Sequence, residues 1–454
     1  MTSTLKVSQQ YKIIKAEISA DRLGPTAIDV RAMIGELNLF ETLEKPYVTG
    51  TLLLLDDKSI MDKLNFRGTE KLTIEIASVA DINEPRIGGP PGKEKTFLMT
   101  KIEKTIRTND KTEVNLITLV EEHFFFDKLV KVSRSFTASL ESIMTEIFVG
   151  SLNKTVDQSY LTKSSQGVRK INIPYMHPLE AVDWIRDRAT TELGGPFFTY
   201  SSVFDNSIRI ASLDGLMRQP AFNSRSPFIY SSAMAQKSED LSESQRSFLI
   251  EGFKMSDAED SMKMVSKGAL GSMYTNTDIG TGITSRDRFT IRDVLTEMKS
   301  RDLIPPNSVQ SVYDENQSFI NKYTDQYDSK VYHQITSSGT YDKFQGYHDV
   351  TDSREHTLKL KNISIRNALY RNMMNVVVPG VAFMYAKISV GDIMRCRFAS
   401  SADDVKTQNA DTLTDKQKSG DYLIYAVRHM FRGTKHSASV NITKLTKEYL
   451  LSGR

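Results

Sequence analysis

Hydrophobic and polar residues alternate along the stretch SGDYLIYAVRHMFRGTKHSASVNITKLTKEYL, which covers residues 419–450. Its second half places Ala438, Val440 and Ile442 between small polar residues. A period of two is typical of a β-strand that buries one face. The pattern therefore predicts a β-hairpin that turns near Gly433.

Residues 28–120 contain several further patterns of this kind. The run of leucines at 52–55 predicts a strand that is buried on both faces, and the alternation at 72–76 predicts another strand. Two more strands are expected at about 96–106 and 112–120, joined by a short polar turn. This part of the chain is therefore expected to be β-structure.

The pattern changes between residues 131 and 222, where apolar residues recur at helical spacing. The stretch LESIMTEIF (140–148) predicts one helix, and HPLEAVDWIRDRATTEL (177–193) predicts a second, amphipathic helix. Pro178 suits the first turn of the second helix, and the glycines that follow residue 193 suit its end. A strand is expected after these glycines, so the region predicts a small α/β domain.

The later part of the chain is more polar. Residues 256–360 are rich in Gly, Ser, Thr and Asp, which predicts an inserted, loop-rich β domain. Helical spacing returns at 360–375, and a strand is expected at 389–398. The polar stretch at 399–418 predicts a loop before the final hairpin.

Two distant stretches of the chain resemble each other. Residues 97–118 read FLMTKIEKTIRTNDKTEVNLIT, and residues 422–443 read YLIYAVRHMFRGTKHSASVNIT. With one residue gapped in the turn, Val114 aligns with Val440, and the strands that precede the two hairpins also match in position. This predicts a duplicated barrel-like unit, with chance similarity between two hairpins as the alternative. Three chains with two units each would form six similar units around a threefold axis.

Composition limits the possible functions. The chain has 454 residues, a net charge of +3, 39% hydrophobic and 25% charged residues, so a multi-domain globular protein is expected. The near balance of charge argues against a dedicated nucleic-acid-binding surface. Cys396 is the only cysteine, which excludes an intrachain disulfide. No apolar segment suits a signal peptide or a transmembrane helix, so we expect a soluble protein made in a cytoplasm.

Two stretches have the composition of a metal or phosphate site without its spacing. His348, Asp349, Asp352 and His356 fit no compact metal-binding motif and predict a solvated loop. The glycine-rich stretch 268–282 lacks the Gly-Lys-Ser/Thr of a phosphate-binding loop. We therefore expect no metal and no cofactor.

Three other sets of polar residues are explained without catalysis. Residues 121–123, Glu-Glu-His, end a predicted strand before an aromatic run, as a strand-end charge cluster does. The acidic pair at 56–57 suits the cap of the following helix. Cys396 shares a strand face with Met394 and Phe398, which favours a buried, inert thiol. No catalytic residue is therefore expected.

Basic residues gather on the final hairpin. A solvated surface is the simpler interpretation, and a charged contact with a neighbouring subunit or a tube protein is the alternative. The residues are Arg428, Arg432, Lys435, Lys444 and Lys447.

Several stretches carry a resemblance to a known family. They are GELNLFETLEKPYVTGTLLLLDDKSIMDKLNFRGTEKLTIEIASVADINE (35–84), the helix at 177–193, and the late motifs VPG, VGD, GDYLIYAVRHMF and VNITKLTKE. In these stretches the sequence resembles the central baseplate hub proteins of contractile-tailed bacteriophages of the T-even type. The match is weakest over 256–360. The shared motifs are packing patterns, so they carry over no site residues.

The resemblance implies a mainly β chain with α/β additions. Two similar β-barrel domains of the tail-tube type are expected, with a small α/β domain and a polar inserted domain. The expected boundaries are 1–130 for the first barrel, 131–222 for the α/β domain, 223–255 with 361–448 for the second barrel, and 256–360 for the insert.

The resemblance also implies a non-enzymatic hub at the centre of a tail baseplate in the virion, assembled in the host cytoplasm. Its partners would be two further copies in a homotrimer, a central spike protein, a tail tube or tube-initiator protein and baseplate wedge proteins. Viral DNA would pass through the ring, and no membrane insertion is expected. The alternatives are a tail-associated cell-wall hydrolase or peptidase, with 256–360 as its catalytic domain, and an adhesin.

Overall fold

The computed structural model describes most of the chain. The described residues are 10–24, 26–79, 87–88, 94–108, 112–165, 167–231, 246–255, 262, 266, 271–279, 282–304, 331–336, 353–371, 373–399, 414–415 and 418–445.

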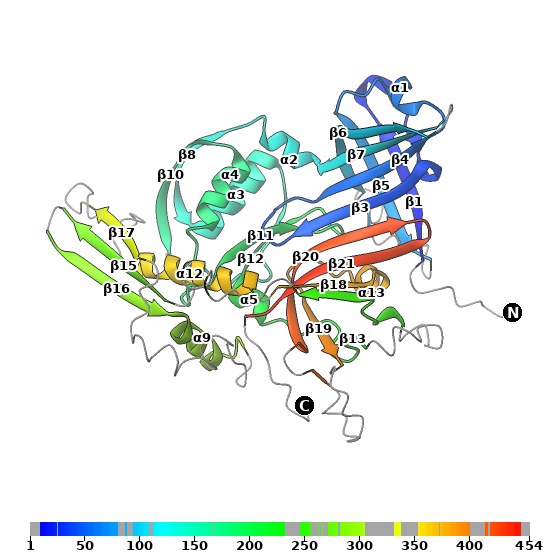
Figure 1. Ribbon diagram of the computed structural model, residues 1–454. Coiled ribbons are helices and arrows are strands. Elements are labelled where there is room, and N and C mark those ends of the chain that lie inside the picture. Colours follow the sequence, from blue (N-terminus) through cyan, green and yellow to red (C-terminus); the bar gives the residue numbers. More distant parts are fainter. Residues whose placement is uncertain are drawn as a thin grey trace, which may run out of the picture.

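Thirteen strands form one large, mainly antiparallel sheet (Figure 1). Seven of them make up what we call the first β unit, in which the strand order is β3-β4-β7-β6-β5-β1-β2. Its elements are β1 (Tyr11–Ser19), β2 (Ile28–Asp29), β3 (Ile34–Thr42), β4 (Thr49–Asp56), the short helix α1 (Ile60–Leu64), β5 (Glu70–Ser78), β6 (Lys95–Arg107) and β7 (Glu113–Glu121). The four strands expected from periodicity are therefore present.

The other six strands make up the second β unit, ordered β14-β18-β21-β20-β19-β13. Its elements are β13 (Phe228–Tyr230), β14 (Gly252–Met255), β18 (Met374–Pro379), the short helix α13 (Val381–Ala386), β19 (Ile393–Phe398), β20 (Gly420–Arg432) and β21 (Lys435–Thr443). The predicted terminal hairpin is β20–β21, and Val440 and Ile442 are fully buried as expected.

The two units share one strand order. The series β3-β4-β7-β6-β5 in the first unit matches β14-β18-β21-β20-β19 in the second, and a short helix follows both β4 and β18. Both long strands also carry a bulge at the same place, at Thr100 in β6 and at Tyr425 in β20. The repeat predicted from the two hairpin sequences is therefore present in the topology.

The predicted alignment of the repeat was wrong at one point. Val440 lies opposite Val427, and the matching pair in the first unit is Ile117 opposite Ile102. Ile117, and not Val114, is thus the counterpart of Val440. The first hairpin has a longer turn and an extra bulge at Glu103, which shift β7 relative to the gapped alignment. Val114 consequently lies on the opposite face from the buried Ile117.

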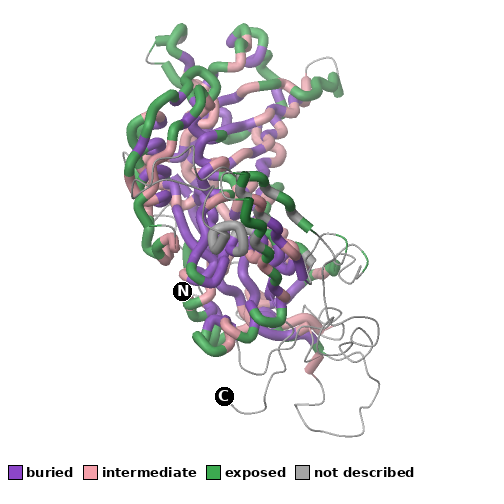
Figure 2. Tube along the Cα trace, turned by 90° about the vertical axis from the view of Figure 1, so that its left-hand side faces the viewer, coloured by how far each residue is buried: buried purple, intermediate pink, exposed green. Residues whose placement is uncertain are grey.

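The two units are joined edge to edge along what we call the seam. Residues 426–432 of β20 pair with residues 36–42 of β3, from Ala426 opposite Thr42 to Arg432 opposite Glu36. Phe431 of the second unit is buried in the core of the first unit, where its ring lies 5.0 Å from that of Tyr11. Buried residues lie in the middle of the molecule (Figure 2), and Phe431 crosses from one unit into the core of the other.

A smaller α/β region follows the first unit. It contains α2 (Glu122–Asp127), β8 (Val132–Ser139), α3 (Leu140–Leu152), β9 (Val156–Asp157), β10 (Val168–Met176), α4 (Pro178–Arg186), β11 (Phe197–Ser201), β12 (Ile208–Ser212) and α5 (Leu213–Met217). Helices α3 and α4 share a core with two small sheets, β10-β8 and β11-β12-β9. Pro178 starts α4 as predicted, but the helix ends at Arg186 instead of residue 193. The β-branched Thr190 lies beyond it and forms a bridge with Pro196.

The polar region is more regular than its composition suggested. Strands β15 (Gly271–Asp278), β16 (Thr284–Thr290) and β17 (Val331–Thr336) form a three-stranded sheet, accompanied by α9 (Ile291–Ser300) and α12 (Ser353–Arg371). Helix α9 was not predicted. The helix expected at 360–375 starts earlier and ends earlier, because residues from Met374 pair with β21. Among the described helices, none is long and apolar enough to cross a bilayer.

Candidate functional site: the seam and the carboxylate beneath it

The acidic pair at 56–57 contains a helix cap. Both carboxylate oxygens of Asp56 accept backbone N–H bonds, from Ile60 at 2.9 Å and Met61 at 2.9 Å. Asp56 is buried, whereas Asp57 is exposed. The capping role predicted for this pair is confirmed, and Asp56 provides it.

The cluster at 121–123 contains a buried ion pair. Glu121 lies 2.6 Å from the ammonium of Lys95, and its other oxygen accepts the N–H of Val48 at 2.7 Å. Burial acts against the ionised carboxylate, but the charges of Lys95, His123 and Lys154 and the hydrogen bond from Lys95 together outweigh it, so the pKa of Glu121 lies below its ordinary value. His123 is buried and bonds to the carbonyl of Pro46 at 2.7 Å. These contacts hold β4, β6 and β7 together at the end of the first unit.

The only cysteine of the chain, Cys396, is buried in the second unit. Cys396 is buried beside Met394 and Phe398, and burial raises its pKa well above the ordinary value. A thiol held in the protonated form is a poor nucleophile. The predicted burial of the cysteine is therefore confirmed.

The basic residues of the final hairpin do not form one surface. The guanidinium of Arg428 bonds to Asn38 at 3.1 Å across the seam, and Arg432 and Lys435 are exposed. Lys444 is buried and donates to the carbonyl of Ser419 at 3.3 Å, so the solvated-surface interpretation is wrong for this residue. Lys447 lies outside the described residues.

Two of the sequence candidates cannot be placed as sites. His348, Asp349 and Asp352 lie outside the described residues, and so does the side chain of His356 in α12. Part of the glycine-rich stretch 268–282 forms β15. Among the residues that the structure describes, no group of three or more His, Cys, Asp or Glu could hold a metal ion.

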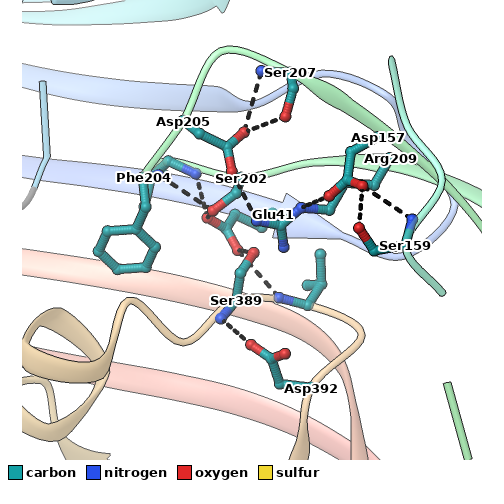
Figure 3. A network of polar contacts seen from close by, with 12 residues as sticks. Glu41, Asp157, Ser159, Ser202, Phe204, Asp205, Ser207, Arg209, Ser389 and Asp392 are labelled. Carbon is teal, nitrogen blue, oxygen red and sulfur yellow. Dashed lines mark hydrogen bonds and ion pairs between the residues drawn. The ribbon is translucent and has the colours of Figure 1, made fainter. Parts of the chain in front are cut away.

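A polar junction that the sequence analysis missed lies beneath the seam (Figure 3). Its centre is Glu41, which is buried near the end of β3. One carboxylate oxygen accepts the N–H of Val203 at 2.5 Å, and the other accepts the hydroxyl of Ser389 at 2.6 Å. The N–H of Val390 also donates to that second oxygen at 3.3 Å. One side chain of the first unit thus contacts both the α/β region and the second unit.

A buried lysine also binds the segment that contains Val203. Lys95, at the start of β6, donates to the carbonyls of Ser202 at 2.7 Å and Asp205 at 2.8 Å, besides its ion pair with Glu121. Farther along, Arg209 bonds to Asp205 at 2.7 Å and lies 3.8 Å from Asp157. Residues 202–209 are therefore held by charged groups on two sides.

Burial changes the proton affinity of the central carboxyl. It raises the pKa of Glu41 to about 7, and the hydrogen bonds from Ser389, Val203 and Val390 and the charge of Lys95 offset only part of that rise. Asp392, which accepts the N–H of Ser389 at 2.9 Å, also has its pKa raised by burial. Two carboxyl groups with raised pKa thus contact the same serine.

The outer side of the seam is hollowed. A groove of about 380 Å³ lies over the junction of the two units. Asn375 donates to Ser439 at 3.0 Å and to Asn441 at 2.7 Å, so these polar side chains are fixed to one another. The lining residues are Phe40, Glu41, Thr42, Lys45, Tyr47, Thr49, Asn375, Ala426, Val427, Arg428, Ser439 and Asn441.

The sequence did carry a signal for this junction. Glu41 falls on the same strand face as Leu37 and Leu39, and Lys95 falls on the same face as Phe97 and Met99. A charged residue at a core-facing position is rare unless it is paired. Both carboxylate oxygens of the buried Glu41 accept hydrogen bonds from backbone and hydroxyl donors. Glu41 therefore joins the first unit to the α/β region and to the second unit.

Comparisons with known proteins bear on the fold. No family model matches the chain, and no curated protein matches it. The 43 kDa tail protein of prophage MuSo2 from Shewanella oneidensis is 10% identical, with 95% of this chain and 98% of that chain covered and a TM-score of 0.50. The tail protein from Neisseria meningitidis MC58 is 8% identical, with 96% and 97% covered and a TM-score of 0.47. A type VI secretion system component of E. coli is 7% identical, with 97% and 79% covered and a TM-score of 0.41. The chain thus shares its overall fold with the Shewanella prophage tail protein.

Proposed function

We propose that the chain is the structural hub of a contractile phage tail baseplate. In this proposal three copies form a pseudo-sixfold ring between a sixfold tail tube and a threefold central spike, and DNA passes through the ring. The two β units act as the two tube-type barrels of each chain. The role is structural, without catalysis, at the centre of the virion baseplate.

One observation carries the proposal: two β units with the same strand order lie side by side in one continuous sheet. A chain with one such unit would match a sixfold ring only as six copies, whereas a chain with two matches it as three. The sharing of fold with a prophage tail protein supports the same class of function.

The remaining parts are assigned by position. Residues 131–222 form a brace that is bonded to the first unit through Glu41 and Lys95 and to the second unit through Gln219, which donates to the carbonyl of Gly391. The sheet of β15, β16 and β17 lies apart from the large sheet, as expected for an insert outside the ring (Figure 1). The partners in this proposal are the spike, a tube or tube-initiator protein and the baseplate wedges.

The test is the mass and shape of the assembly. The purified full chain is measured by native mass spectrometry, alone and with its central spike protein, and the particles are imaged by electron microscopy. We expect three chains per particle and six similar densities around the ring. A chain that stays monomeric in both conditions would exclude the proposal, and lytic activity on cell-wall zymograms would favour the hydrolase alternative.

A further inference from the structure

Half of strand β6 has a partner on only one side. Strand β5 covers its first half, from Lys95 opposite Ile74 to Met99 opposite Glu70. Beyond that point β7 is the only strand that pairs with β6 in the described part of the chain. The side chains at 103–107 are exposed, and Ile106 is exposed by 46%. Among the described residues, the second half of β6 is therefore an open sheet edge.

In the second unit, the corresponding edge is paired with another strand. Strand β20 is the counterpart of β6, and β19 covers its first half from Gly420 to Leu423. Its second half, residues 426–432, is covered by β3 across the seam. The open edge of β6 is thus the place where the seam would be repeated.

The strand that would repeat the seam must be the counterpart of β3. That strand is β14, because β14 pairs with β18 as β3 pairs with β4. In the described residues β14 pairs with β18 alone. Met255, at the end of β14, is 41% exposed. Within its described residues the chain therefore has one open edge of each kind, and a second copy would offer the matching edge.

We propose that the open half of β6 pairs with β14 of a second copy of this chain, so that the seam recurs between copies. The proposal rests on the proposed function and names the surface by which the ring would close. An exposed strand edge offers unpaired N–H and C=O groups to another strand. The second copy is the occupant because the two edges are counterparts of two strands already joined within the chain.

The register follows from the seam. There Met430 lies opposite Asn38. Met430 also lies opposite Ser437, whose counterpart in the first unit is Val114, and Val114 lies opposite Ile106. Ile106 therefore takes the place of Met430.

The same counting applies to the other strand. Asn38 lies opposite Thr51, and Thr51 lies opposite Thr118. Thr118 is the counterpart of Asn441, which pairs with Asn375, so Asn375 is the counterpart of Thr51. Asn375 in turn lies opposite Lys254. Lys254 therefore takes the place of Asn38. The geometry places Ile106 of one copy directly opposite Lys254 of the partner subunit.

A pair of cysteines tests this register in the full chain. Directly opposed residues of antiparallel strands lie about 4.5–5.5 Å apart, within reach of a disulfide. We expect Ile106→Cys with Lys254→Cys in one chain to give covalent trimers under mild oxidation, seen on denaturing gels without reductant. Equal mixtures of the two single variants should give dimers only. Both positions are at strand edges on the surface, and unchanged thermal unfolding of the reduced protein checks the fold.

The matched control pairs Leu55→Cys with Lys254→Cys. Leu55 is 40% exposed, close to the value for Ile106, but β4 is paired on both sides and offers no edge. Cys396 is buried and should not contribute. Equal bridging in the control and the test pair would overturn the inference.

The outcomes separate the inference from the proposed function. Three chains by native mass without the bridge would overturn the inference and leave the hub proposal in place. In that case Lys101, Lys104 and Arg107 would be charges that keep the edge of β6 unpaired. A chain that is monomeric alone and with its spike would overturn both.

Discussion

The two β units have similar cores and different outer faces. In the core, Ile102 opposite Ile117 matches Val427 opposite Val440. On the other side of the sheet the first unit carries partly exposed apolar residues, namely Leu53, Leu55, Ile106, Val114 and Leu116. The second unit has Ser437 and Ser439 in place of Val114 and Leu116, and it keeps apolar residues, Val377, Pro379 and Met430, in place of Leu53, Leu55 and Ile106. Core-facing residues thus maintain the shared strand order, while the outer faces have diverged in polarity along β7 and β21.

The largest effect should come from a charge placed in the matched cores. Val440→Asp and Ile117→Asp each bury a carboxylate among apolar side chains, at a cost of about 4 kcal/mol or more. We expect both variants to lose soluble expression. The controls Ser439→Asp and Val114→Asp alter the outer faces and should remain soluble with nearly unchanged thermal unfolding. Equal tolerance at Val440 and Ser439 would show that the alternation does not define a core.

The next effect concerns the residue that crosses between the units. Phe431→Ala should destabilise the chain by about 3–5 kcal/mol, because its ring fills the core of the first unit. Hydrogen exchange should then speed up in β3, β4 and β7. Phe398→Ala is the matched control, since Phe398 is buried in the core of the second unit. If both variants speed up hydrogen exchange in the same strands, the two cores unfold together and not separately.

A pH effect tests the contact between the units. The pKa of Glu41 rises from 4.5 to about 7 on folding, so the folded chain binds more protons between these values. Stability from this group is full below about pH 4.5 and falls by up to about 3 kcal/mol as pH rises to 7. Glu41→Gln should flatten this slope in denaturant titrations at several pH values. Glu36→Gln, a less buried carboxylate of the same strand, should leave the slope in place.

The smallest effect is expected on the outer faces. Leu55→Ser makes the outer face of the first unit more polar and should change the free energy of unfolding by about 0.5 kcal/mol or less. The measurement is urea unfolding of the variant beside the parent chain. A loss above about 2 kcal/mol would mean that this face packs against something within the chain.

Periodicity predicted most strands because one buried face repeats every second residue. It placed Val440 and Ile442 correctly, but it could not count the bulge at Glu103, so Val114 instead of Ile117 was aligned with Val440. A bulge adds one residue to a strand and reverses every later side chain. Helix α9 was missed because the region was judged by its polar composition.

The junction beneath the seam could be predicted only in part. A carboxylate on the core face of β3 signalled a buried, paired group, but its partner Ser389 lies 348 positions away. Such pairing depends on the tertiary fold, and no local pattern states it. The pairing of β20 with β3 across the seam could not be predicted either, because the sequence of an edge strand has the same pattern as that of any other half-buried strand.

The position of Phe431 has a consequence for how the protein is made. Asn38 and Arg428 meet across the seam although 390 positions separate them. At about 5–20 residues per second, a ribosome needs roughly 20–80 s to cover that distance. During this interval the nascent first unit lacks the ring that completes its core and the strand that covers β3. A chain released before residue 431 would therefore expose apolar side chains in the core of the first unit, which favours aggregation of the truncated product.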